Sequence, residues 1–176
     1  MLVAAVSFAQ LREGGDSSML HLQVEDIGTI PIALNDSFQS AATLKALAAA
    51  GTSGKVHRAE SLPSAGSNGP PYALVQFQLS GLEKLAHEGT AKITRGAVCH
   101  IGGTSDLFVS LARGKEHDGW EQSMTIVGQV PEPELSALVE GAILARPKHN
   151  FTHPNYGTVM SMLDKELPCK LTLAQG

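Results

Sequence analysis

Residues 19–34 read MLHLQVEDIGTIPIAL, and this stretch decides the class of the fold. Polar and apolar side chains alternate over residues 19–25, which predicts a strand with one buried face. Asp26-Ile27-Gly28 supplies a turn, and residues 29–34 predict a returning strand. Pro31 cannot donate to a neighbouring strand, so we expect it at an edge or a bulge. The stretch therefore predicts a β-hairpin.

The rest of the chain continues this pattern of short strands, interrupted by two helices. Side-chain acceptors at residues 35–37 are suited to capping a helix over 41–50, and Gly51 ends it. Prolines and glutamates at 131–134 favour a second helix that runs to residue 144. Further strands are predicted over residues 55–60, 72–79, 90–94, 96–101, 106–112, 124–130 and 167–173, with loops over 61–71, 113–119 and 147–157.

Many short strands without regular strand–helix alternation predict a mainly β fold. Local patterning leaves open whether the strands form a barrel or a sandwich. The apolar helix faces, Leu44 with Leu47 and Leu138 with Ile143, must bury against whichever core forms. We assign residues 1–18 to an N-terminal arm and residues 19–176 to one domain, a size that suits a single core.

Composition narrows the function classes. The chain is 43% hydrophobic and 17% charged, values typical of a globular protein. A formal charge of −4 and the lack of a Lys/Arg stripe argue against a nucleic-acid partner. No run approaches the ~18 apolar residues that a membrane span needs. Cys99 and Cys169 lie in no CxxC pair, and two buried free thiols are expected unless the fold brings them together to pair.

Five short motifs follow one another along the chain: Val56-His57-Arg58, Ala73-Leu74-Val75-Gln76, Arg95-Gly96-Ala97-Val98-Cys99, Asp106-Leu107-Phe108-Val109-Ser110 and Ile126-Val127-Gly128-Gln129-Val130. In this order they resemble the cyclophilin family of peptidyl-prolyl isomerases over residues 19–173. The chain also carries Arg-Ala-Glu (58–60) and Gly-Pro-Pro-Tyr-Ala-Leu (69–74), and in this it resembles a divergent plant and algal branch of the family. The resemblance implies a closed eight-stranded antiparallel barrel with two capping helices, and a proline-containing peptide or protein as partner.

Prolyl isomerisation asks little of a site in chemical terms. The two planar forms of an Xaa-Pro bond differ by only about 0.5–1 kcal/mol, but the rotation barrier is about 18–20 kcal/mol. A catalyst must bind the twisted amide better than either planar form. Directed donors in a dry groove do this, so no nucleophile, metal or cofactor is implied.

The resemblance assigns the catalytic roles to three residues. Arg58 would supply the guanidinium, although it could also be a surface arginine that pairs with Glu60. Gln76 would fix the substrate backbone, and its alternative is an ordinary polar strand residue. Phe108 would form the floor of the proline pocket, and core packing is its alternative.

The rim of the implied groove departs from the family pattern. Ala73 and Leu74 stand where the family has Phe and Met, and Ile101-Gly102 replaces Ala-Asn. Met124 stands where a histidine is expected, and Trp120 lies near the usual indole position. Lost apolar contact and obstruction predict a rate lower by one to three decades, at about 1.36 kcal/mol per decade.

Three functional hypotheses follow: a slow prolyl isomerase, a catalytically silent binding module that could be a subunit of a larger assembly, and a different barrel that binds a small ligand.

His149 and His153 are four residues apart in a predicted loop, without the spacing of a metal site. Asn150-Phe151-Thr152 is a glycosylation sequon. With the family branch, it points to the secretory pathway.

Overall fold

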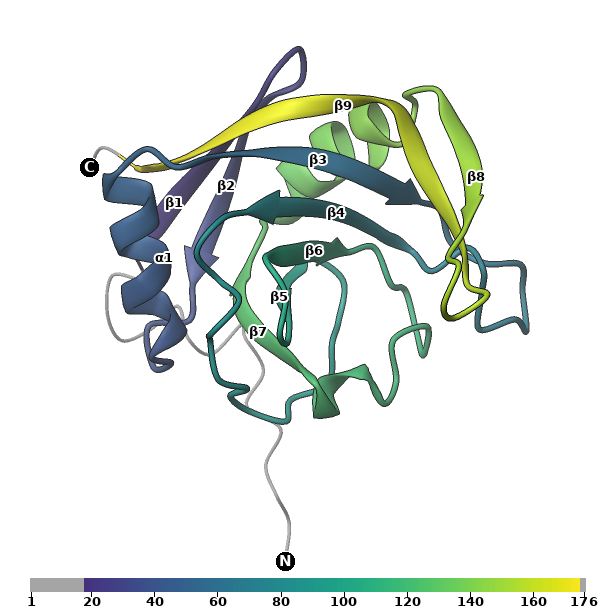
Figure 1. Cartoon of the computed structure of the whole chain (residues 1–176), viewed down its shortest axis with the longest axis horizontal. Coiled ribbons are helices and arrows are strands. Elements are labelled where there is room, and N and C mark those ends of the chain that lie inside the picture. Colours follow the sequence, from purple (N-terminus) through teal and green to yellow (C-terminus); the bar gives the residue numbers. More distant parts are fainter. Residues whose placement is uncertain (1–17, 175–176) are drawn as a thin grey trace, which may run out of the picture.

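The computed structural model describes residues 18–174, and Figure 1 shows them as strands curled around a common interior. The predicted arm, except for Ser18, lies outside these residues. The strands are β1 Met19–Val24, β2 Gly28–Leu34, β3 Ser53–Glu60, β4 Leu74–Leu79, β5 Ala97–Ile101, β6 Asp106–Ser110, β7 Met124–Gln129, β8 Lys148–Thr152 and β9 Val159–Leu173.

The strands close into a barrel. The sheet order is β1-β2-β7-β5-β6-β4-β3-β9-β8, and β1 also pairs with β9, so eight strands form a closed ring. Strand β8 is the ninth strand: it pairs with the first part of β9, whereas β1 pairs with the last part. Every pairing is antiparallel. The expected eight-stranded antiparallel barrel is confirmed, and the sandwich that local patterning left open is not formed. Pro31 pairs with His21 on β1 and lies outside the short β2–β7 ladder.

Two helical segments pack against this barrel. Helix α1 spans Ser40–Ala49 and buries Leu44 and Ala48. The second begins as α2 at Glu132–Glu134 and continues as a wide π-type turn, η3, over Leu135–Ile143. Leu135, Val139 and Ile143 enter the same interior core as Leu44. A short helical turn, η2, covers Trp120–Gln122.

The cap of α1 comes from a distant residue and not from the expected acceptors at 35–37. The Glu88 carboxylate accepts the backbone N–H of Gln39 at 2.8 Å and that of Ser40 at 2.9 Å. A carboxylate there satisfies free helix donors and complements the positive end of the helix dipole. Asp36 instead accepts the N–H of Ser18 and pairs with Lys45.

Two further expectations about local structure are wrong. Residues 90–94 form no strand; Ile93 is buried in an apolar cluster with Phe108, so it packs without strand pairing. The predicted loop over 147–157 contains β8, which forms a hairpin with β9. All five β8 residues are exposed. A strand that is exposed to solvent on both faces has no alternation of apolar and polar residues, so its sequence does not predict a strand.

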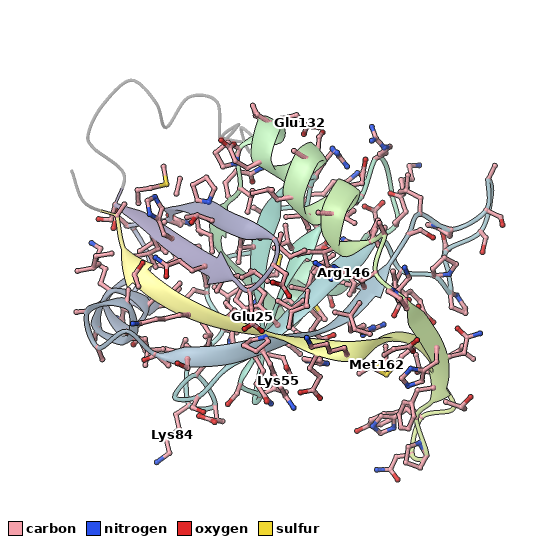
Figure 2. The ribbon with its side chains drawn as sticks, turned by 90° about the horizontal axis from the view of Figure 1, so that it is seen from above. Glu25, Lys55, Lys84, Glu132, Arg146 and Met162 are labelled. Carbon is pink, nitrogen blue, oxygen red and sulfur yellow. The ribbon has the colours of Figure 1, made fainter. Side chains whose placement is uncertain are left out.

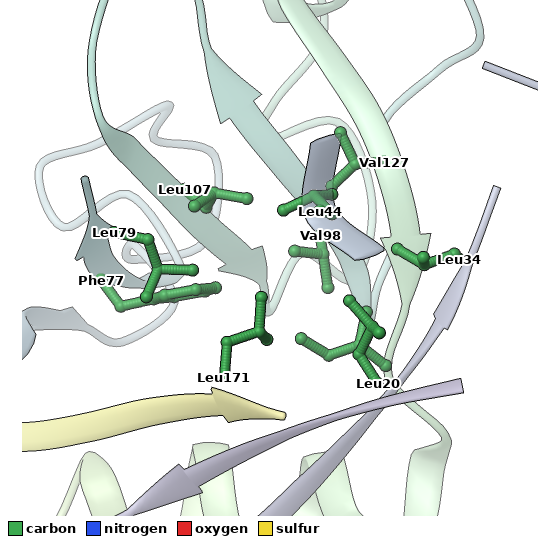
Figure 3. Close-up of a pocket in the computed structure, with 10 residues that line it drawn as sticks. Leu20, Leu34, Leu44, Phe77, Leu79, Val98, Leu107, Val127 and Leu171 are labelled. Atoms are coloured by element: carbon green, nitrogen blue, oxygen red, sulfur yellow. The ribbon is translucent and has the colours of Figure 1, made fainter. Parts of the chain in front are cut away.

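The barrel interior is filled by its own side chains. Figure 3 shows leucines, valines and a phenylalanine from the barrel wall and α1 that converge on one point. The free volume among them is about 10 Å³. That is no more than one water molecule needs, so this point offers no cavity for a small ligand.

Candidate functional site

The strand register brings the three residues of the implied catalytic set together. Arg58 on β3 lies directly opposite Gln76 on β4, and Gln76 lies opposite Phe108 on β6. Directly paired residues point to the same face of a sheet. With strands about 4.8 Å apart, the Cα atoms of Arg58 and Phe108 are about 10 Å apart. That separation fits one peptide-sized site.

This row lies on the outer face of the barrel wall. The interior core takes the alternate residues of β4 and β6, such as Val75, Leu107 and Val109. Phe108 belongs to a second apolar cluster on the opposite face. Its buried members are Leu74, Ile93, Ala97, Cys99, Phe108 and Ile126, and Tyr72, Ile101, Trp120 and Met124 pack around them.

The Arg58 guanidinium is oriented by its neighbours. Its Nε donates to the Glu60 carboxylate, its Nη1 donates to Gln76 Oε1 at 3.0 Å, and its carbon lies 5.8 Å from the centroid of the Tyr72 ring. A guanidinium has five N–H bonds. Two are used in these bonds, so three have no hydrogen-bond partner within residues 18–174. The arginine is thus both held in place and able to donate further.

Glu60 connects three segments beneath Arg58. Its side chain is 1% exposed. Besides Arg58, it accepts the backbone N–H of Tyr72 at 3.0 Å and that of Ser161 on β9 at 3.4 Å. The pairing of Arg58 with Glu60, which the sequence offered as an alternative to catalysis, is present. This pairing fixes where the guanidinium points.

Phe108 is covered by the chain itself. It is 0% exposed. The rings of His117 and Trp120 meet it edge-on at 5.5 and 5.8 Å and stack on each other at 4.3 Å. Both belong to the segment between β6 and β7. These rings cover Phe108, so its ring is closed off from solvent in this structure.

Hydrogen bonds hold His117 in this position. Its Nε2 donates to the Tyr72 carbonyl at 2.6 Å, and its Nδ1 accepts from the Ser110 hydroxyl at 2.9 Å. These donor and acceptor roles are those of the neutral ring with its proton on Nε2. Burial lowers the pKa of His117 from 6.5, outweighing the opposing effects of the Tyr72 carbonyl and Glu116.

The residues predicted to bind substrate fall into two groups. Leu74, Ile101, Trp120 and Met124 lie in or around the outer cluster, and Ile101 pairs directly with Met124. Ala73 does not join them: it is 0% exposed and packs into the interior core. Gly102 is exposed, and a Cβ there would lie 3.0 Å from the Ser123 carbonyl oxygen.

Sequence reasoning missed two members of the site. Tyr72 contacts Arg58 and lies 6.0 Å from Trp120, centroid to centroid. His117 covers Phe108. Tyr72 appeared only within a quoted motif, and a lone histidine in a polar loop carries no signal by itself. Their roles depend on how two loops fold back over the barrel.

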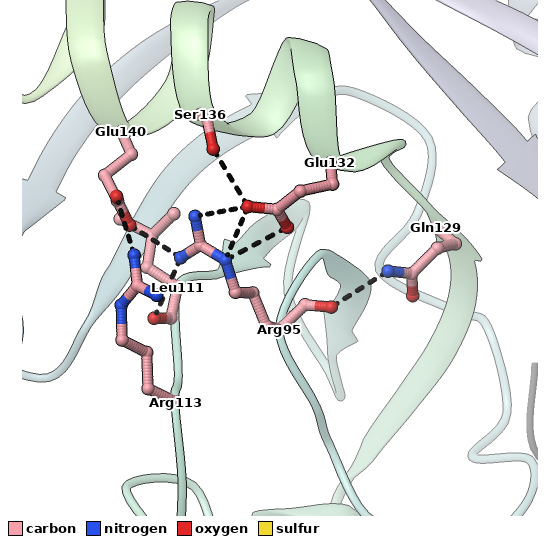
Figure 4. A network of polar contacts seen from close by, with 7 residues as sticks. All are labelled: Arg95, Leu111, Arg113, Gln129, Glu132, Ser136 and Glu140. Atoms are coloured by element: carbon pink, nitrogen blue, oxygen red, sulfur yellow. Dashed lines mark hydrogen bonds and ion pairs between the residues drawn. The ribbon is translucent and has the colours of Figure 1, made fainter.

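A second polar cluster lies away from this site, at the start of the second helical segment. Arg95 donates to both oxygens of Glu132 and to Glu140, and Arg113 also donates to Glu140 (Figure 4). Arg95 lowers the pKa of Glu132 and of Glu140 through these bonds. The carboxylates balance the arginines, so the cluster joins the loops to the helix and leaves no free charge for a ligand.

The two cysteines lie on different sides of the barrel wall. Cys99 belongs to the outer cluster and Cys169 to the interior core, and both are free and buried. Burial raises the pKa of Cys169 to about 12 and raises that of Cys99 as well. Both thiols stay protonated and unreactive at neutral pH.

Residues 18–174 contain no group of three His, Cys, Asp or Glu side chains placed to hold a metal ion. Over the same residues, no helix is long and apolar enough to cross a membrane. No protein family model and no curated protein matches this chain. The chain itself shows an eight-stranded antiparallel β-barrel with two helices and an apolar cluster around Phe108 on its outer face, where Arg58 lies over the Tyr72 ring at the edge of the cluster.

Proposed function

We propose that this protein binds proline-containing peptides on the outer face around Arg58 and isomerises their Xaa-Pro bonds slowly. The observation that carries the proposal is the register: Arg58, Gln76 and Phe108 occupy one row on one face of three neighbouring strands. A donor, an amide and an aromatic ring therefore stand side by side across about 10 Å.

The chemistry follows from the guanidinium. As an Xaa-Pro bond twists, its resonance breaks and the prolyl nitrogen gains a lone pair that can accept a hydrogen bond. The unpartnered N–H bonds of Arg58 can donate to it, while Glu60 and Gln76 keep the group from turning away. Donors that are already oriented stabilise the twisted state without reorganising.

The covered Phe108 explains why the rate should be low. A proline ring can reach Phe108 only if Trp120 and His117 move aside. Breaking the two His117 hydrogen bonds has a free-energy cost of about 1 kcal/mol each. Each 1.36 kcal/mol of free energy spent on opening this cover lowers the rate about tenfold. Two bonds therefore account for one to two decades, within the range expected from the altered rim.

The same observation supports a second candidate, a binding module without catalysis. If the His117–Trp120 cover stays closed, peptides can still contact Tyr72, Met124 and Ile101 around the edge of the outer cluster. Binding would then occur without a proline ring over Phe108, and no bond would be twisted.

A protease-coupled isomerisation assay on Ala-Pro peptides separates the candidates, with binding followed by fluorescence anisotropy of a labelled peptide. We expect isomerisation that is measurable above the uncatalysed rate and that disappears in Arg58→Ala. Lys55→Ala serves as a control, because Lys55 pairs with Glu166 at the surface of the same strand. Binding without isomerisation would select the silent module, and absence of both would reject peptide recognition at this face.

A further inference from the structure

The Arg58 face does not end at β3. Met162 on β9 lies directly opposite Arg58, and His149 on β8 lies opposite Met162. Two positions along the hairpin, Phe151 lies opposite Met160. Because paired residues share a face and every second residue returns to it, these side chains point to the same side as Arg58. The β8–β9 hairpin therefore extends the outer face of the site.

This extension is apolar and partly open. Phe151 is 44% exposed, and Met160 and Met162 are half-buried. The intervening residues follow the opposite face, where Leu163 enters the interior core. In Figure 1 the hairpin projects beside the end of β3, and Figure 2 shows Met162 where β9 approaches β8. We call Phe151, Met160 and Met162 the hairpin strip.

We propose that the hairpin strip is a specificity subsite that takes an apolar side chain of the bound peptide about three residues from the prolyl bond. This inference rests on the proposed function. The distance between the strands sets the position of this residue in the peptide: β8 lies two strand spacings, about 10 Å, from β3. An extended peptide advances about 3.3–3.6 Å per residue, so three residues span that distance.

The chemistry of the strip selects the class of side chain. Thioether side chains are flexible and polarisable, so they adapt to differently shaped apolar groups. The polar pair on the hairpin itself is already engaged, since His149 Nδ1 and Asp164 Oδ1 are 2.7 Å apart. Leucine, methionine or phenylalanine should therefore be preferred at this peptide position over serine or glutamate.

The test compares labelled Ala-Pro peptides that carry leucine or serine three residues from the prolyl bond, in one series on its amino side and in another on its carboxyl side. Binding is measured by fluorescence anisotropy on the full chain. We expect about tenfold tighter binding of the leucine peptide in one series, because burying about half of such a side chain gives that factor. In the double variant Phe151→Ser, Met162→Ser the two peptides should bind equally.

Val159→Ser is the matched control, because Val159 is 36% exposed on the same hairpin but on its opposite face. It should keep the leucine preference. Unchanged affinity of the double variant for the serine peptide shows that it is folded and that the Arg58 site is intact. Equal binding of both peptides by the wild type would overturn the subsite and leave the proposed function standing. A preference that survives the double variant would also overturn it, and no binding of any peptide would overturn both.

Discussion

Replacing Glu60 by alanine tests whether the Glu60 carboxylate holds Arg58 and the neighbouring backbone in place. The substitution removes the partner of the Arg58 Nε and the acceptor for two backbone N–H groups, those of Tyr72 and Ser161. Breaking a buried ion pair by removing one member costs about 3–5 kcal/mol. Arg58 keeps 11% exposure and can recover some hydration, so we expect the lower end, about 3 kcal/mol.

Urea unfolding measures this loss directly. With a slope of about 2 kcal/mol per molar urea, a loss of about 3 kcal/mol lowers the midpoint by about 1.5 M. Glu60→Gln keeps an acceptor for Tyr72 but loses the charge, so it should fall between the wild type and Glu60→Ala. Glu166→Ala removes an exposed carboxylate that pairs with Lys55, and should cost no more than about 1 kcal/mol. A Glu60→Ala midpoint as close to the wild type as that of Glu166→Ala would refute the described role of Glu60.

Two more predictions concern stability. Glu88→Ala should cost about 1–2 kcal/mol, because it leaves the first N–H groups of α1 without their acceptor; amide hydrogen exchange should speed up at Gln39 and Ser40, and unchanged exchange there would contradict the long-range cap. His117 has a pKa below its usual 6.5 in the fold, so the unfolded chain binds this proton more tightly. Its stability contribution is therefore complete above pH 6.5 and is lost as the pH falls through the lowered pKa. In His117→Gln, the melting temperature should depend less on pH over this window. The same pH dependence as in the wild type would contradict the neutral, buried ring.

The sequence predicted most of the barrel from two different patterns. Strands β1 and β2 alternate between exposed and buried residues, whereas β4, β5, β6 and β7 are buried on both faces and stand out as short runs rich in strand-forming residues. Residues 19–34 show this alternation, and they form the expected hairpin. Strand β8 was missed because Lys148–Thr152 is exposed on both faces. The α1 cap was missed because Glu88 acts across 48 residues of sequence, farther than any local capping pattern extends.

The candidate site shows the same division. The placement of Arg58, Gln76 and Phe108 depends on strand order and register, which the family resemblance supplied and local patterning could not. Ala73 was grouped with Leu74 on the groove rim, but it lies just before β4 with a left-handed backbone (φ 52°) and packs into the interior core, so only Leu74 joins the outer cluster. Tyr72 and His117 are placed by loops, whose packing over the barrel has no periodic signature.

The central claim is that the Arg58 guanidinium acts on the twisted prolyl bond, and exchange spectroscopy tests it most directly. The cis and trans signals of an Ala-Pro peptide interconvert too slowly to exchange on their own, and a catalyst introduces cross-peaks between them. We expect these cross-peaks with the wild type, none with Arg58→Ala, and strongly reduced exchange with Arg58→Lys, which keeps the charge but loses the planar fork of donors. Equal exchange rates with wild type and Arg58→Ala, at equal peptide saturation, would contradict the claim.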